Sequence, residues 1–262
     1  MNTILSNLQN KLIVSCQAFP GSPLYGADYM QKMAMCAIEG GAGGIRACWS
    51  DNVKAVREIT NLPIVGINKL MDDEPLSIHK VYITPTFDSA AEVIEAGADI
   101  LGMDCTPRGR TYDDIHKMIE QIKKHYPAIL IMADLSTLEE GTKAEEMGVD
   151  IVSTTLSGYT PESLKLDPEQ YRSLVQNASP MDKIHEISPD FELIKDLRKK
   201  VKVKINGEGR ISEASQVVKA MQCGADMITI GAAITMPEKI TGKFVNALRL
   251  ACSSDDVDSI EK

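Results

Sequence analysis

Short apolar runs recur along the chain, with amphipathic and polar segments between them. Four places share one plan, in which a helical pattern is followed by a glycine, a small or acidic residue and a β-branched apolar run. These runs end near Ala47, Asp104, Thr155 and Gly231. Glycine suits the left-handed turn that ends a helix, and a Val- and Ile-rich run suits a strand buried on both faces. The pattern predicts a repeated helix-to-strand connection.

Four further apolar runs begin at Leu12, Pro63, Ile129 and Val201, which brings the predicted strands to eight. Helical patterns, with apolar residues three and four positions apart, span 88–97, 111–126, 137–148, 189–200 and 212–224. Eight strands alternating with helices in 262 residues favour an α/β fold of the (β/α)8 TIM-barrel type over a doubly wound sheet. No GxGxxG motif follows the first strand, which also disfavours a dinucleotide-binding sheet.

The whole chain, 1–262, is predicted to form one barrel domain with three irregular parts. An extra extended piece begins at His79, after the third strand. An enlarged loop region covers about 157–190, and a polar, flexible tail begins at about residue 252. The first two segments follow strands, so we expect them to cover the end of the barrel where such enzymes bind their substrates.

Charge and composition narrow the classes of partner. The net charge of -9 argues against nucleic acid or an anionic membrane as the main partner, and no stretch has the length and apolarity of a membrane span. The six cysteines lack the spacing of a metal site, and we expect most of them to be buried thiols. A cytoplasmic protein without bound metal is predicted.

Polar residues mark the carboxyl ends of the predicted strands. In a parallel barrel these positions point into one common mouth. Two cations, three carboxylates and an amide are among them, more ionisable groups than a purely structural barrel needs. The positions are Gln17, Arg46, Lys69, Asp104, Asp134, Thr154 with Thr155, Glu208, and the pair Gly231 and Ala232.

Most of these residues also have a structural interpretation. Lys69 could end its strand as a solvated edge residue, and Arg46 could form a structural ion pair with a carboxylate. Asp104 and Asp134 could cap the helices that follow them. Gln17 could be a buried hydrogen-bonding residue. None of these alternatives is settled by the sequence.

Glu208 and Lys69 together indicate proton transfer at carbon. Glu208 lies between two glycines, which allow backbone or ligand to approach closely and favour a functional role over a surface turn. A partly desolvated lysine among cations has a lowered pKa and can remove a proton next to a carbonyl. A carboxyl group opposite it can return a proton to the other face, which is epimerisation. A Schiff base at Lys69 is the competing use.

The last predicted strand leads into a possible phosphate site. Gly231 and Ala232 are followed by Pro237 at a helix start, so backbone N–H groups at a helix N-terminus would face an anion. Barrels commonly bind phosphate at this place. Gly209, after the seventh strand, would supply the other half.

The chain resembles the N-acylglucosamine-6-phosphate 2-epimerase family, also called N-acetylmannosamine-6-phosphate 2-epimerase, of bacterial sialic acid catabolism. The resemblance is carried by LIVSCQA, GGIRA, PIVGINK, YITPT, MDCT, MADLSTLEEG, DIVSTTLSGYTP, GEGRI and GAAIT, in this order along nearly the whole chain. It implies a carbohydrate isomerase that needs no cofactor and acts on a small phosphorylated amino sugar.

The resemblance implies that Lys69 is the base at C2 and that Glu208 is the opposing acid–base group. It implies substrate contacts from Gln17, Arg46 and Asp134. The full set of predicted substrate-binding residues is Gln17, Arg46, Asp134, Thr155, Tyr159, Gly209, Arg210, Gly231 and Ala232.

Three positions depart from the family pattern. Met236 stands where the family has an arginine that helps to bind the substrate, Leu70 stands where it usually has another arginine, and Ala232 replaces a glycine. Losing a charge-assisted hydrogen bond of about 1.5–3 kcal/mol would weaken phosphate binding. Lys239 or Arg210 could compensate, or the substrate could differ.

Two alternatives therefore stay open beside the epimerase. One is another sugar-phosphate barrel enzyme, either a different epimerase or a Schiff-base aldolase. The other is a protein that binds an amino-sugar phosphate without turnover. We also expect a homo-oligomer, a dimer, in which the apolar segment 242–252 either forms the interface or is the ordinary closing helix of the barrel.

Overall fold

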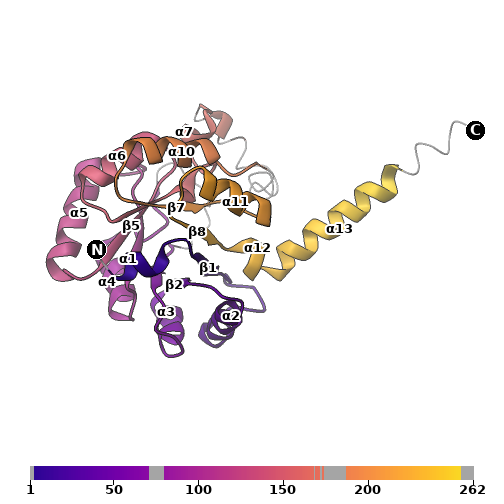
Figure 1. The fold of residues 1–262 in the computed structure, drawn as a ribbon, viewed down its shortest axis with the longest axis horizontal. Coiled ribbons are helices and arrows are strands. Elements are labelled where there is room, and N and C mark those ends of the chain that lie inside the picture. Colours follow the sequence, from indigo (N-terminus) through magenta and orange to yellow (C-terminus); the bar gives the residue numbers. More distant parts are fainter. Residues whose placement is uncertain (1–2, 71–79, 168, 172, 174–186, 255–262) are drawn as a thin grey trace, which may run out of the picture.

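The computed structural model describes residues 3–70, 80–167, 169–171, 173 and 187–254. Eight parallel strands close into one barrel in chain order, β1 to β8 (Figure 1). This confirms the predicted (β/α)8 fold. The strands are β1 Leu12–Cys16, β2 Gly44–Cys48, β3 Ile64–Ile67, β4 Ile100–Asp104, β5 Leu130–Asp134, β6 Ile151–Ser153, β7 Lys204–Glu208 and β8 Met227–Ile230.

In the part of the chain that the structure describes, seven helices surround the barrel, and all five predicted helical segments are among them. They are α2 Ala27–Glu39, α3 Ser50–Arg57, α4 Phe87–Glu95, α5 Tyr112–His125, α6 Leu138–Glu146, α10 Phe191–Lys200 and α11 Ala214–Gln222. Thr86, Thr111 and Thr137 cap α4, α5 and α6, since each side chain accepts a hydrogen bond from the backbone N–H three residues on. The apolar run from Val201 becomes a strand only at Lys204, because Val201 still donates to Leu197 at the end of α10.

The barrel interior is apolar at one end and polar at the other. The short helix α1 (Thr3–Leu8) covers the amino-terminal end, where Leu8 packs with Ile13, Val65, Ile100 and other inward side chains. Because side chains alternate along a strand, the residue two positions after each of these inward side chains also points into the barrel. These second positions include polar side chains, and the mouth lies beyond them.

The last two helices leave one side of the barrel open. The four-residue helix α12 (Ala232–Thr235) follows β8, and the 18-residue helix α13 (Pro237–Ser254) extends away from the barrel instead of lying along its wall (Figure 1). The interpretation of 242–252 as an ordinary closing helix is therefore wrong. The helix continues to Ser254, past the predicted start of the tail, and residues 255–262 lie outside the described part.

Two predicted segments are only partly described. The extended piece predicted to begin at His79 is described from residue 80 onward, and His79 itself lies outside the described residues. Within this piece Ile83 forms an antiparallel bridge with Lys69, which agrees with the predicted extended conformation. In the loop region 157–190, η1 (Thr154–Leu156) leads to the short helix α7 (Pro161–Leu164). Both pieces follow strands, so they lie at the mouth.

The cysteine prediction is only half right. All six thiols are free, but only Cys16, Cys48 and Cys105 are buried, while Cys36 and Cys252 are exposed on helices. Within the described ranges no helix is long and apolar enough to cross a membrane. The same residues contain no group of three or more His, Cys, Asp or Glu side chains arranged to hold a metal ion.

Candidate active site

The barrel brings the predicted strand-end residues to one mouth, with the two proposed acid–base groups on opposite walls. Lys69 follows β3 and Glu208 ends β7, and these strands lie four places apart in the closed ring. Each residue affects the ionisation of the other, together with Arg46 and Asp134. The four charged side chains therefore share one electrostatic site.

Arg46 holds the two mouth carboxylates from below. Its guanidinium is 2% exposed and donates to both oxygens of Asp134, with Nη1 3.1 Å from Oδ1 and Nη2 2.8 Å from Oδ2. Nη1 also lies 3.2 Å from Oε2 of Glu208. Burial opposes the charge of Arg46, but the neighbouring Asp134 and Glu208 outweigh it and raise its pKa. The predicted ion pair of Arg46 is thus present, and it has two carboxylate partners.

Gly102 on β4 leaves room for a side chain of the neighbouring strand. A Cβ at Gly102 would lie 2.6 Å from Cγ2 of Ile67, which is too close, whereas its distance of 3.6 Å from Nη1 of Arg46 is an ordinary van der Waals contact. Glycine at this position therefore accommodates Ile67 beside the Arg46 guanidinium.

The carboxyl group of Glu208 is surrounded by groups that shift its pKa in opposite directions. Burial raises its pKa above the ordinary value, the nearby Asp134 charge raises it further, and Arg46 and Lys69 oppose both effects. Glu208 is intermediate in exposure, at 10% for its side chain. A carboxyl group whose pKa is raised is more readily protonated, as the proposed proton donor must be.

Lys69 is held by three neighbouring segments. Its backbone bridges Ile83, its carbonyl accepts from Nε1 of Trp49 at 3.0 Å, and its N–H lies 3.4 Å from Sγ of Cys48. The ammonium group lies 5.1 Å from the centre of the Phe19 ring. These contacts fix the backbone and direct the side chain along an aromatic wall.

The Lys69 amine has the electrostatics predicted for a base. Burial lowers its pKa, and the Arg46 cation lowers it further, against the opposing influence of Cys48, Glu208 and Asp134. Within the described part of the chain its ammonium group forms no ion pair. An amine without a salt-bridge partner can lose its proton more readily, as the proposed base must.

Asp134 does not cap the following helix; Thr137 does. Besides Arg46, its carboxylate accepts a hydrogen bond from Oγ1 of Thr155, at 2.6 Å. Thr155 is therefore at the site, directly above β6. Of the interpretations left open for Asp134, capping is excluded by this geometry.

Asp104 has a structural role in the next loop. Its Oδ1 accepts from the N–H and the hydroxyl of Thr106, and its Oδ2 lies 2.6 Å from Nη2 of Arg108. All three side chains are buried. Asp104 thus anchors the loop between β4 and α5, but Thr111 and not Asp104 caps α5, so the capping interpretation is wrong.

Gln17 lies directly against the proposed phosphate site. Its Nε2 donates to Oγ of Ser15 at 2.9 Å, and a Cβ on Gly231 would lie only 2.4 Å from the same nitrogen. Gly231 precedes α12, which begins at Ala232. Met236, at the end of this helix, is buried and offers no charge.

The remaining predicted residues lie on the opposite rim. Gly209 has φ +104°, a conformation that favours glycine, and its Cα faces the Thr154 carbonyl. The Arg210 guanidinium lies 5.8 Å from the ring centre of Tyr159 and donates to the backbone carbonyls of Ser157, Ile187 and Ser188. These contacts bind Arg210 to the loop, so it offers little compensation for the charge missing at Met236.

Sequence reasoning missed the polar layer beneath the mouth. Ser153, Asn206 and Thr229 are buried and hydrogen-bonded to one another. Each lies two positions before a residue at a strand end, so the period-two alternation of a strand contained the signal. Trp49, Phe19 and Cys48 complete the surroundings of Lys69.

The closed barrel, with charged side chains gathered at the carboxyl ends of its strands, has the architecture of a (β/α)8-barrel enzyme. The sequence profile of the NanE family, described as "Putative N-acetylmannosamine-6-phosphate epimerase", matches residues 30–250. The chain belongs to this family.

Relatives and a solved structure agree. The chain is 41% identical over 250 residues to a protein of Caldanaerobacter subterraneus subsp. tengcongensis named "Putative N-acetylmannosamine-6-phosphate 2-epimerase", covering 94% of each chain. It is 38% identical to a protein of that name from Clostridium perfringens, over 94% of this chain and all of the other. The solved N-acetylmannosamine-6-phosphate 2-epimerase of Clostridium perfringens superposes with a TM-score of 0.77 at 36% identity, covering 94% and 96% of the two chains.

Proposed function

We propose that this protein interconverts N-acetylmannosamine 6-phosphate and N-acetylglucosamine 6-phosphate at C2, within sialic acid catabolism in the cytoplasm. The observation that carries the proposal is the placement of Lys69 and Glu208 on opposite walls of one mouth, each with its pKa displaced towards neutrality by burial. Family membership supplies the substrate class.

The reaction begins with the open-chain sugar, in which C2 lies next to the C1 aldehyde. The neutral Lys69 amine takes the C2 proton, and the C–H electron pair forms a C1=C2 double bond while the carbonyl electrons move to O1. Glu208 then delivers a proton to the opposite face of C2, and the carbonyl re-forms. The configuration at C2 is inverted, and the two groups exchange roles in the reverse direction. No electron leaves the substrate, so this scheme requires no redox cofactor.

The other polar residues are proposed to hold the sugar. Asp134 and Thr155 lie beside Glu208, Gln17 lies beside Gly231, and Tyr159 lies on the rim with Arg210. The phosphate is proposed to lie between the Gly209 turn and the Gly231 and Ala232 backbone. Arg46, under both carboxylates, supports the site mainly by holding them in place.

The test is deuterium exchange at C2. We would incubate the protein with N-acetylmannosamine 6-phosphate in D₂O, follow C2 by proton NMR, and run the unphosphorylated sugar in parallel. Deuterium at C2 and the gluco product from the phosphorylated sugar alone would support the proposal. Exchange only with the free sugar would show that Met236 marks a changed substrate, and no exchange with either would favour a binding protein. Borohydride trapping of Lys69 with substrate would favour the aldolase.

We further propose that the protein is a dimer joined through α13. One face of this helix carries Phe244, Val245, Leu248 and Cys252, and the side chains of Phe244 and Leu248 are 69% and 67% exposed in one copy. A continuous apolar face on an 18-residue helix indicates a buried partner surface.

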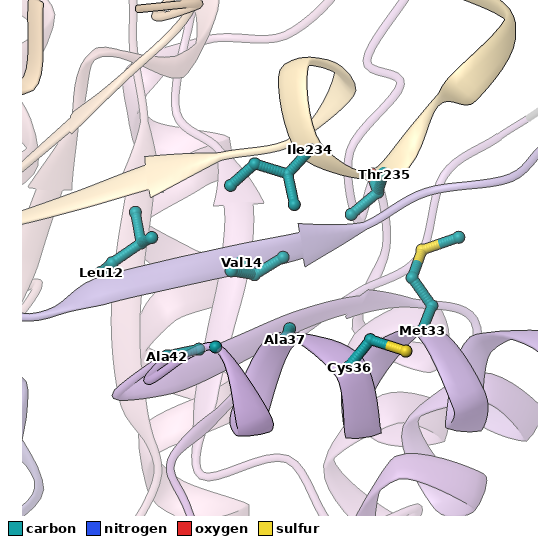
Figure 2. Close-up of a pocket in the computed structure, with 9 residues that line it drawn as sticks. Leu12, Val14, Met33, Cys36, Ala37, Ala42, Ile234 and Thr235 are labelled. Carbon is teal, nitrogen blue, oxygen red and sulfur yellow. The ribbon is translucent and has the colours of Figure 1, made fainter. Parts of the chain in front are cut away.

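The barrel offers a matching surface. An apolar cleft of about 230 Å³ opens on the outer wall between α2, β1 and α12, away from the mouth. Its lining is Leu12, Val14, Met33, Cys36, Ala37, Gly40, Ala42, Ile234 and Thr235 (Figure 2). The helix that follows the last strand of a β/α barrel ordinarily covers this wall. Because α13 points away from its own barrel, we propose that α13 of a second copy covers it.

A further inference from the structure

The carboxyl group of Glu208 is held by one of its two oxygens. Oε2 lies within hydrogen-bond distance of Arg46, Ser153, Thr155 and Asn206, at 3.2, 3.3, 3.2 and 3.1 Å. Within the described part of the chain, every hydrogen bond to this carboxyl group reaches Oε2. Oε1 is therefore the oxygen left for a substrate.

The number of hydrogens on each neighbouring group limits which of the four can donate to Oε2. The Thr155 hydroxyl has one hydrogen, and its shortest contact is Oδ1 of Asp134, at 2.6 Å. The Ser153 hydroxyl also has one hydrogen, and its shortest acceptor is Oγ1 of Thr155, at 2.7 Å. Each hydroxyl thus donates its single hydrogen to an acceptor nearer than Oε2. Arg46 and Asn206 are left as the donors to Oε2.

Asn206 has the right hydrogens and a fixed orientation. Its Nδ2 carries two hydrogens and lies 2.8 Å from Oγ of Ser153 and 3.1 Å from Oε2 of Glu208. Its Oδ1 accepts from the Thr229 hydroxyl, at 2.9 Å. The opposite orientation of the amide would bring Oδ1 against the Glu208 carboxylate. The side chain is fully buried, so water does not compete for these bonds.

The hydrogen bonds consequently run in one direction across three strands. Thr229 on β8 donates to Asn206 on β7, and Asn206 donates to Ser153 on β6. The Ser153 hydroxyl then donates to Thr155, whose hydroxyl donates to Asp134. Asn206 is the branch point of this sequence, because its amide donates both to Glu208 and to Ser153, which leads on to Asp134.

We propose that Asn206 is a positioning residue for the epimerisation: it holds Oε2 of Glu208 from below, so that Oε1 is the oxygen that exchanges a proton with C2. This inference rests on the proposed function. Asn206 does not touch the substrate, and it acts through Glu208 and, by way of Ser153 and Thr155, through Asp134.

The first test is Asn206→Asp, which keeps the shape and removes both donors. The groups that face Glu208 are Arg46 from β2, Lys69 after β3, Asp134 from β5 and Tyr159 after η1. A new carboxylate 3.1 Å from Oε2 adds a like charge to this set, so the acid limb of the pH–kcat profile should move up by about one unit or more. Asn206→Leu should lower kcat about ten- to a hundredfold through misplacement of the carboxyl group, with KM little changed.

Two further variants separate positioning from simple loss of stability. Thr229→Ser keeps the donor to Asn206 and should preserve the acid limb. Thr229→Val removes this donor and should weaken the effect of Asn206 on the position and titration of Glu208. Asp226→Asn is the stability control, because Asp226 accepts from the N–H of Ile205 at the far end of the same strand pair. It should lower thermal stability without moving the limb.

A measurement that does not depend on activity completes the design. Carbon-13 NMR of labelled glutamate, assigned with Glu208→Gln, reports the titration of the Glu208 carboxyl group directly. An upward shift in Asn206→Leu, in which the donor to Oε2 is lost and no charge is added, supports the positioning role. It does so even if the wild-type protein fails to epimerise the sugar, an outcome that would overturn only the proposed function. An unshifted titration and an unshifted acid limb in a folded, active Asn206→Asp variant would overturn the inference and leave the epimerase standing.

Discussion

The guanidinium of Arg46 and the carboxylate of Asp134 lie side by side inside the barrel, joined by hydrogen bonds of 2.8 and 3.1 Å with both side chains almost completely buried. Two parallel N–H···O bonds fix the orientation of both planes. The same guanidinium reaches Glu208. One buried cation thus sets the positions of both carboxylates of the mouth.

Replacing Arg46 should therefore destabilise the fold as well as the site. Arg46→Leu leaves two carboxylates without their cation, and removing one partner of a buried pair costs about 3–5 kcal/mol of unfolding free energy. Urea denaturation measures this loss. The matched control is Arg198→Leu, which breaks a pair with Asp226 in which the arginine is 38% exposed and should cost about 1 kcal/mol or less. Equal losses would contradict the structural importance assigned to Arg46.

Substitutions of Lys69 and of Glu208 should affect the reaction in different ways. Lys69→Met removes the base, so C2 exchange should fall by about 10²–10⁴-fold or more. Lys69→Arg keeps a cation that stays protonated and should be equally inactive. Glu208→Gln should still exchange the C2 proton that faces Lys69, while conversion to the other epimer falls. Proton NMR in D₂O follows both processes, and full conversion by Glu208→Gln would mean that Lys69 acts on both faces.

The pH profile should be a narrow bell. One proton is shared between Lys69 and Glu208 in either direction of reaction, so activity is lost at low pH when both are protonated and at high pH when neither is. The raised pKa of Glu208 places the acid limb above an ordinary carboxyl titration, and the lowered pKa of Lys69 places the basic limb below an ordinary lysine titration. The limbs belong to the pair rather than to single residues. Initial rates across pH measure them, and a broad plateau bounded by ordinary pKa values would contradict the proposed pair.

The sequence predicted the barrel because its signal is local and repeated. Glycine-terminated helices and β-branched runs alternate along the chain, and eight such strands in this length favour a closed ring over a doubly wound sheet. The strand ends followed from the same pattern, so Lys69 and Glu208 could be placed at one mouth in advance. Their backbone surroundings depended on Ile83 and Trp49, which no periodicity connects to Lys69.

Other features could not be read from local patterns. The two carboxylate partners of Arg46 come from β5 and β7, each three places from β2 around the closed ring but in opposite directions. Choosing Asp134 rather than Asp104 as a partner needed the three-dimensional structure. The direction of α13 depends on the turn between two helices, whereas its amphipathic pattern is the same whether it packs on its own barrel or on another. The pattern therefore indicated a buried face without saying against what.

Gly231 offers a test of Gln17. A Cβ at Gly231 would lie 2.4 Å from Nε2 of Gln17, and the end of a flexible side chain can move aside. Gly231→Ala should therefore raise KM about tenfold, as the loss of one substrate hydrogen bond would, with little change in thermal stability. Steady-state kinetics of Gln17→Ala and of the double variant check the cause. If the effect acts through Gln17, the double variant is no worse than Gln17→Ala; additive losses would place Gly231 in contact with the substrate itself.

The apolar face of α13 should decide the oligomeric state. Leu248→Asp puts a charge in the centre of that face, so the proposed dimer should dissociate and its apparent dissociation constant should rise by a hundredfold or more, about 3 kcal/mol. Asn246→Asp is the matched control, because it adds the same charge about 160° away on the same helix. Sedimentation velocity across protein concentrations measures both variants. Since α12 connects β8 to α13 and also lines the cleft, the dissociated Leu248→Asp protein should also show a higher KM through the Gly231 turn. A wild-type protein that sediments as a monomer at all concentrations would contradict the dimer.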